Sequence, residues 1–143
     1  MLRSTLAVLA FSATAAAAQG VVTEPYDGSV ADAAFAVETA ITGMGLRIVF
    51  TGNVGEMLEQ TGEQFGLGPS PVGPDAKTFL FCSMTAGRDA IVADPTNLGN
   101  CPLSIFVAEI DGGTVIGHRV FVEETMSEMN DLLDAVVAEA TAW

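Results

Sequence analysis

The stretch from residue 103 to residue 122 constrains the fold more than any other part of the chain. Two apolar segments, 103–110 and 114–122, are separated only by Asp111-Gly112-Gly113. A turn this short between two strands needs positive φ angles, which glycine adopts easily. We therefore predict an antiparallel hairpin at this position.

Two amphipathic segments predict long helices near the two ends of the domain. One runs from residue 30 to residue 44, after Ser29, which can cap the helix with Asp32 at the capping-box position. The other begins at Ser127 and carries a buried stripe to residue 140. Further strands are predicted at 21–23, 47–51 and 77–84, and a short helix at 86–93. This order predicts an α+β sandwich, in which an antiparallel-rich sheet carries the two long helices on one face.

Residues 54–75 are the least regular part of the sequence. A short helix fits 54–65, whereas the glycines and prolines of 66–74 require a loop, because proline lacks a backbone donor. A loop this long is either a lid or mobile edge, or a solvated insertion.

The N-terminal segment has the layout of a secretory signal peptide. Arg3 gives a positive start, residues 6–11 are apolar, and Ala16-Ala17-Ala18 offers a cleavage site before Gln19. The alternative, a membrane anchor, needs about 20 apolar residues, and this run is shorter. We expect a signal peptide over 1–18 and a single domain over 19–143. The product is then periplasmic or secreted, with no membrane attachment after cleavage.

The charge of the chain argues against one class of partner. The net charge is −13, with only 5 lysines and arginines against 18 acidic residues. Nucleic-acid affinity comes largely from basic side chains that neutralise phosphates, so we expect no nucleic-acid partner. The acidic residues are spread along the chain, which is typical of a surface that keeps an exported protein soluble.

The only two cysteines, Cys82 and Cys101, lie at corresponding ends of a predicted strand–helix–strand unit. In an exported chain this pair favours a disulfide. A thiol-exchange or metal-binding role for the pair is one alternative, and two unpaired buried thiols are another.

Met84 and His118 extend the list of candidate ligands. Cysteine, methionine and histidine together suit copper(I), and a histidine–methionine pair suits haem. His118, however, is the only histidine and lies within a predicted strand. An exposed or hydrogen-bonded structural role is the simpler interpretation. On that interpretation, replacing His118 with alanine costs less than about 1 kcal/mol of stability.

Five short segments, taken in their order and spacing, carry a resemblance to a known family. They are Ser29–Asp32, Gly45–Phe50, Phe81–Gly87, Asp94–Gly99 and Cys101–Val107. Together they resemble the domain-of-unknown-function-302 family of small bacterial proteins. The resemblance implies a β-α-β-β-β-β-α arrangement, often as a homodimer, and implies no agreed activity or catalytic residues.

The resemblance also bears on the cysteines. One branch of the family has Cys-Asn-Pro where this chain has Cys82-Ser83-Met84, and Pro-Cys near the next strand where this chain has Cys101-Pro102. The first cysteine therefore matches a family position, and the second is displaced by two residues.

No catalytic constellation is visible in the sequence. There is no Gly-x-Ser-x-Gly motif and no glycine-rich phosphate loop. We predict a non-catalytic binding or interaction module, a homodimer that takes an unknown small ligand or protein and has no cofactor. One alternative is an enzyme of unrecognised type. The other is a periplasmic redox or metal/haem-handling protein that uses Cys82, Cys101, Met84 and His118.

Overall fold

A five-stranded antiparallel sheet forms the centre of the computed structural model, which describes residues 20–142. The elements along the chain are β1 (Val21–Pro25), α1 (Val30–Gly43), β2 (Arg47–Gly52), α2 (Val54–Phe65), β3 (Lys77–Cys82), α3 (Met84–Ala93), the 3-10 helix η1 (Pro95–Asn100), β4 (Leu103–Ile110), β5 (Gly113–Arg119), the 3-10 helix η2 (Glu124–Met126) and α4 (Ser127–Thr141). The strands lie in the order β1-β5-β4-β3-β2, and all neighbours are antiparallel. The predicted α+β architecture is confirmed.

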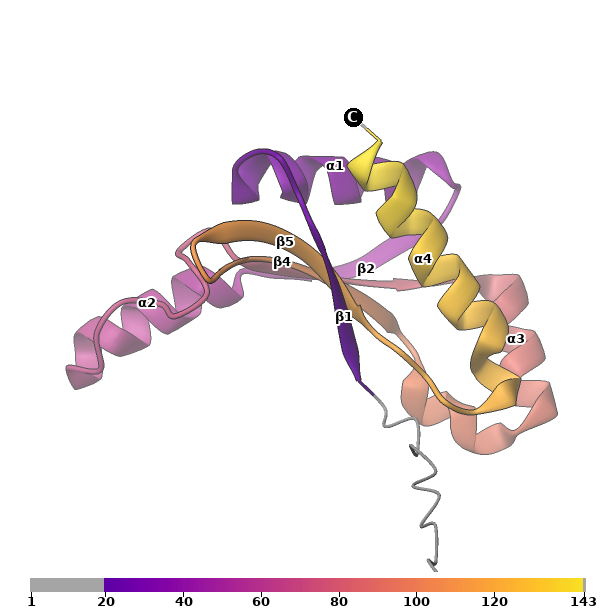
Figure 1. Cartoon of the computed structure of the whole chain (residues 1–143). Helices are drawn as coiled ribbons and strands as arrows, with labels where there is room; N and C mark the ends of the chain where they lie inside the picture. The colour runs from indigo at the N-terminus through magenta and orange to yellow at the C-terminus, as the bar shows by residue number, and fades with distance from the viewer. Residues whose placement is uncertain (1–19, 143) are drawn as a thin grey trace, which may run out of the picture.

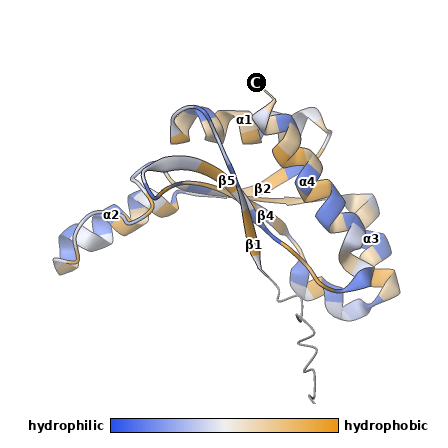
Figure 2. Ribbon diagram, viewed as in Figure 1, coloured by the Kyte–Doolittle hydropathy of each residue, from blue (hydrophilic) through white to orange (hydrophobic). Residues whose placement is uncertain are grey.

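The helices α1 and α4 cover one face of the sheet (Figure 1). The capping box predicted for α1 is present: Ser29 Oγ accepts a hydrogen bond from the Asp32 amide at 3.1 Å, and Asp32 Oδ2 accepts one from the Ser29 amide at 3.2 Å. Along α4, hydrophobic residues recur among hydrophilic ones at the spacing that forms one buried stripe on a helix (Figure 2). Both helices pack against alternate strand residues, among them Phe79, Phe81 and Ile105, which are at most 2% exposed.

The β4–β5 hairpin forms where the sequence predicts it. Asp111 and Gly112 make the turn with φ angles of 53° and 77°, and Ile110 pairs with Gly113. Two positive φ angles in succession match the right-handed twist of the two strands. The hairpin places β5 between β4 and β1, so that β5 lies inside the sheet.

The helix α2 and the loop that follows it form an arm that projects from the sheet (Figure 1). Two buried glycines of α2, Gly55 and Gly62, lie directly against loop backbone, and a Cβ at Gly62 would collide with the carbonyl oxygen of Gly68. The Ser70 amide also donates a 2.7 Å hydrogen bond to Glu59 Oε2. The predicted helix and loop are both present, and the loop packs along the helix.

The ends of several elements differ from the prediction; β1 continues to Pro25, for example, and β5 ends at Arg119. β3 ends at Cys82, two residues early, because Ser83 Oγ accepts a hydrogen bond from the Ala86 amide at 3.3 Å and caps α3. Met84 is therefore the first residue of α3 and does not belong to the strand. Ser127 begins α4 as predicted, but no side chain caps that helix, which continues from η2.

Within residues 20–142, no helix is long and apolar enough to cross a membrane. The predicted signal peptide lies outside the residues that the structure describes.

Candidate functional site

The two cysteines and Met84 line one hollow at the end of β3, which we call the sulfur pocket. Its volume is about 460 Å³, and its walls include Cys82, Met84, Arg88, Ile91, Val92 and Cys101. Both cysteines are half-buried free thiols. The lining is mainly apolar, and no carboxylate belongs to it. A hollow of this size and chemistry suits a small apolar or soft ligand.

The strand pairing brings the two cysteines to the same edge of the sheet. β3 and β4 are antiparallel. The last residue pair toward the C-terminal end of β3 is Phe81 with Leu103. Cys82 follows Phe81, and Cys101 lies two residues before Leu103, so both lie just beyond this pair. Phe81 points into the core, and Cys82 therefore points to the opposite face of the sheet, as alternation predicts.

The returning segment η1 fixes the position of Cys101. The buried side chain of Asn97 donates hydrogen bonds to the carbonyl oxygen of Ala90 at 2.9 Å and to Thr125 Oγ1 at 3.1 Å. The Cys101 amide donates to the carbonyl oxygen of Leu98 at 3.3 Å. These contacts tie η1 to α3 and to η2, so the wall of the sulfur pocket that carries Cys101 is held in place.

The surroundings of Cys101 disfavour its thiolate form. Burial raises the pKa of the Cys101 thiol, and the neighbouring Cys82 raises it further. Arg88 is the one charged residue in the lining. Among residues 20–142, the structure gives Arg88 no carboxylate partner within ion-pair distance. Its guanidinium is therefore available to compensate negative charge that forms in the pocket.

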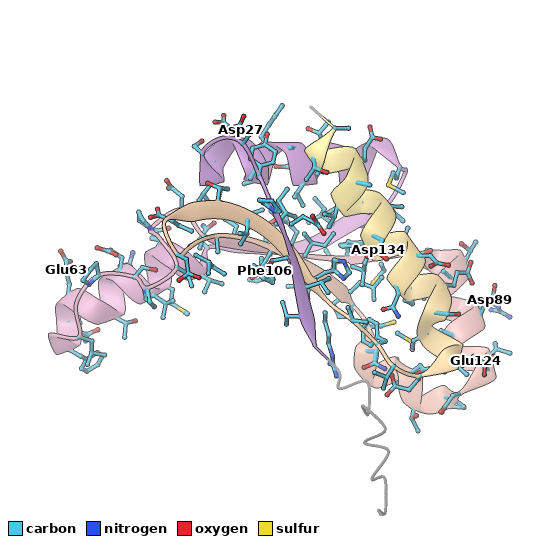
Figure 3. The ribbon with its side chains drawn as sticks, in the orientation of Figure 1. Asp27, Glu63, Asp89, Phe106, Glu124 and Asp134 are labelled. Atoms are coloured by element: carbon cyan, nitrogen blue, oxygen red, sulfur yellow. The ribbon has the colours of Figure 1, made fainter. Side chains whose placement is uncertain are left out.

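His118 lies in a different part of the molecule, and of the two structural roles expected for it the exposed one is wrong. It faces the core from β5 and is only 3% exposed. Its Nδ1 lies 3.0 Å from the carbonyl oxygen of Arg119, and its Nε2 lies 3.0 Å from Oδ1 of Asp134 on α4 (Figure 3). Both partners are acceptors, so both bonds form together when the ring carries two protons. The alternative of a hydrogen-bonded structural histidine fits this geometry.

A second hollow, of about 480 Å³, adjoins His118 between β1, β5 and α4. Its lining includes Val22, Glu24, His118, Asp134, Val137 and Thr141, and neither cysteine belongs to it. The four candidate ligands named from the sequence are thus divided between two hollows. A haem held by Met84 and His118 does not fit this arrangement. Among the described residues, no group of three or more histidine, cysteine, aspartate or glutamate side chains is placed to hold a metal.

Apart from Met84, sequence reasoning did not identify the residues of α3 that line the sulfur pocket. Met84, Arg88, Ile91 and Val92 recur at helical spacing on α3. Met84 and Val92 are 83% and 72% exposed. Such a stripe on a short helix between the two cysteines is the sequence signal that could have identified this side of the pocket.

Comparison with known proteins identifies the same fold. The family model described as "Domain of unknown function DUF302" matches residues 6–142. A crystal structure of an uncharacterised conserved DUF302 protein from Bacillus stearothermophilus is similar, with a TM-score of 0.70 and 14% sequence identity. The similarity covers 84% of this chain and 97% of that one. No curated protein shows a significant match to this chain.

Proposed function

This chain belongs to the DUF302 family, and we propose that it is an exported, non-catalytic binding module whose ligand occupies the sulfur pocket. One observation carries the proposal: a hollow of about 460 Å³ with apolar walls and two half-buried thiols, on the outside of a well-packed domain. Val92 and Met84, which border this hollow, are large apolar side chains that remain exposed to solvent. Exposed apolar surface around a concavity is typical of a binding site.

A neutral apolar probe tests this proposal. N-phenyl-1-naphthylamine fluoresces when it enters an apolar pocket, and we expect saturable binding to the reduced protein. Val92→Glu places a charge on the pocket wall and should weaken the binding about tenfold or more. Leu98→Glu is the matched control, because Leu98 is similarly exposed at 66% and lies outside the lining. Equal binding by the two variants would contradict the proposal.

A second candidate function, thiol–disulfide exchange, is favoured by the position of both thiols in one pocket. In this reaction Cys82 and Cys101 lose two electrons and two protons to a partner disulfide, which becomes two thiols. The disulfide that forms closes a loop of about 20 residues and stabilises the fold by roughly 3 kcal/mol in the chain-entropy model. Equilibration with glutathione buffers, followed by alkylation and mass spectrometry, tests it. Two alkylated thiols in fully oxidised buffer would exclude the disulfide.

We also propose that the protein assembles as a homodimer through the sheet face that α1 and α4 leave uncovered. Phe50 on β2 is 60% exposed, and Leu80, Phe106 and Val115 on the same face are partly exposed. A second copy would remove this apolar surface from water. Light scattering at micromolar concentration should give twice the monomer mass, and Phe50→Asp should shift it to the monomer. A monomeric wild-type protein at all concentrations would exclude the dimer.

Export is the remaining part of the proposal and rests on the sequence of residues 1–18. N-terminal sequencing of the protein from a producing bacterium should find Gln19 or a residue next to it. A membrane-bound product that retains Met1 would contradict export.

A further inference from the structure

Three sulfur-containing side chains, which come from different parts of the secondary structure, line one pocket. Cys82 ends β3, Met84 begins α3 and Cys101 precedes β4, and all three line the sulfur pocket. Met84 is 83% exposed, so its thioether is accessible from solvent. Neither an apolar ligand nor a disulfide needs a thioether at this place.

We propose that Cys82 Sγ, Cys101 Sγ and Met84 Sδ form a binding site for copper(I). The inference rests on the proposed function, because the ion would be a ligand of the same sulfur pocket. Thiolate and thioether sulfur are soft ligands, which favour copper(I), zinc and iron–sulfur clusters over harder metal ions. A structural zinc site takes four nitrogen or sulfur ligands, and this pocket supplies three sulfur atoms and no histidine. Calcium and magnesium need oxygen ligands, and no carboxylate lines the pocket.

The charge balance of the site is favourable. Each thiol releases its proton to solvent as its sulfur binds, so one copper(I) ion displaces two protons and no electron is transferred. Two thiolates and one copper(I) ion leave one negative charge, and the Arg88 guanidinium in the lining compensates it.

Competition with bicinchoninate under anaerobic conditions tests the site on the reduced, mature protein. We expect the wild-type protein to withdraw one equivalent of copper(I) from the chelator. Cys82→Ser and Cys101→Ser should each abolish the withdrawal. Met84→Leu keeps the size and exposure of the side chain but removes the sulfur, and it should weaken binding roughly tenfold, which corresponds to about 1.4 kcal/mol. Met57→Leu on α2 is the control, because Met57 is also exposed, at 55%, and lies outside the pocket.

The results separate this inference from the proposed function. No withdrawal of copper(I) by the wild-type protein would overturn the copper site, as would equal binding by Met84→Leu and Met57→Leu. If naphthylamine binding and its loss in Val92→Glu remain in that case, the pocket still binds ligands and only the copper assignment fails. Circular dichroism of the two serine variants checks that they are folded, and Met84→Leu supplies the test if they are not.

Discussion

Replacement of the buried histidine by alanine should destabilise the protein by at least about 3 kcal/mol. His118→Ala removes a core-facing ring that is 3% exposed, and large-to-small substitutions at such sites cost about 2–5 kcal/mol. The Arg119 carbonyl oxygen loses its partner at 3.0 Å, which adds about 1 kcal/mol. The Asp134 side chain is 68% exposed, so water replaces its ion pair and that loss is under about 1 kcal/mol.

Urea unfolding followed by circular dichroism measures this loss, with Asp134→Asn as the matched control. Asp134→Asn keeps the shape of the partner and removes only its charge, so we expect a change under about 1 kcal/mol. A loss under about 1 kcal/mol for His118→Ala, with an unchanged slope against urea, would refute the reasoning. It would mean that the imidazole contributes no more than a surface side chain.

Three further predictions concern other parts of the molecule. Hydrogen bonds from the Ser29 side chain and backbone hold the pKa of Asp32 below its usual 3.8, so this carboxylate stabilises the fold above that pH. Asp32→Asn should therefore lower Tm at neutral pH, and the difference should vanish as the pH falls through the folded-state pKa. Because burial raises the pKa of Cys101, iodoacetamide at neutral pH should alkylate this thiol more slowly than a cysteine in a peptide, as mass spectrometry can follow; an equal rate would contradict this. Gly62→Ala should detach the loop from the arm and open residues 66–76 to limited proteolysis, whereas Gly43→Ala, which has no atom within 4 Å of its new Cβ, should not.

Local signals in the sequence predicted the frame of the fold. The turn at Asp111 and Gly112 requires positive φ angles, and this requirement is readable from the residue types alone. The Ser29 and Asp32 capping box is equally local, because its two hydrogen bonds lie within one turn of helix. These two signals and the helical periodicity suffice to predict a sheet with two long helices.

Other features depend on tertiary contacts, and local sequence patterns predict them less well. Alternation of apolar residues predicts that β3 extends to Met84, but the cap formed by Ser83 ends the strand first. The burial of His118 depends on Asp134, which lies 16 positions later on α4. Its shared strand face with Ile116, two residues away and fully buried, was the one local indication.

The candidate site was predicted only in part. The position of both cysteines beside the end of one strand followed from the strand–helix–strand unit. Met84 lines the same pocket as the two cysteines, but it lies on α3 and not on the strand that the sequence predicts for it. Arg88 became visible only in the structure, because the sequence does not show which face of α3 borders the cysteines.

Mapping of backbone amide shifts by NMR, as N-phenyl-1-naphthylamine is added to the reduced protein, tests the central claim most directly. The claim is that the ligand site of this protein is the sulfur pocket. We predict that the largest shifts belong to residues 82–92 and to Cys101, which surround that pocket. Shifts gathered instead around His118 and Thr141, in the hollow beneath α4, or on the uncovered sheet face would contradict it.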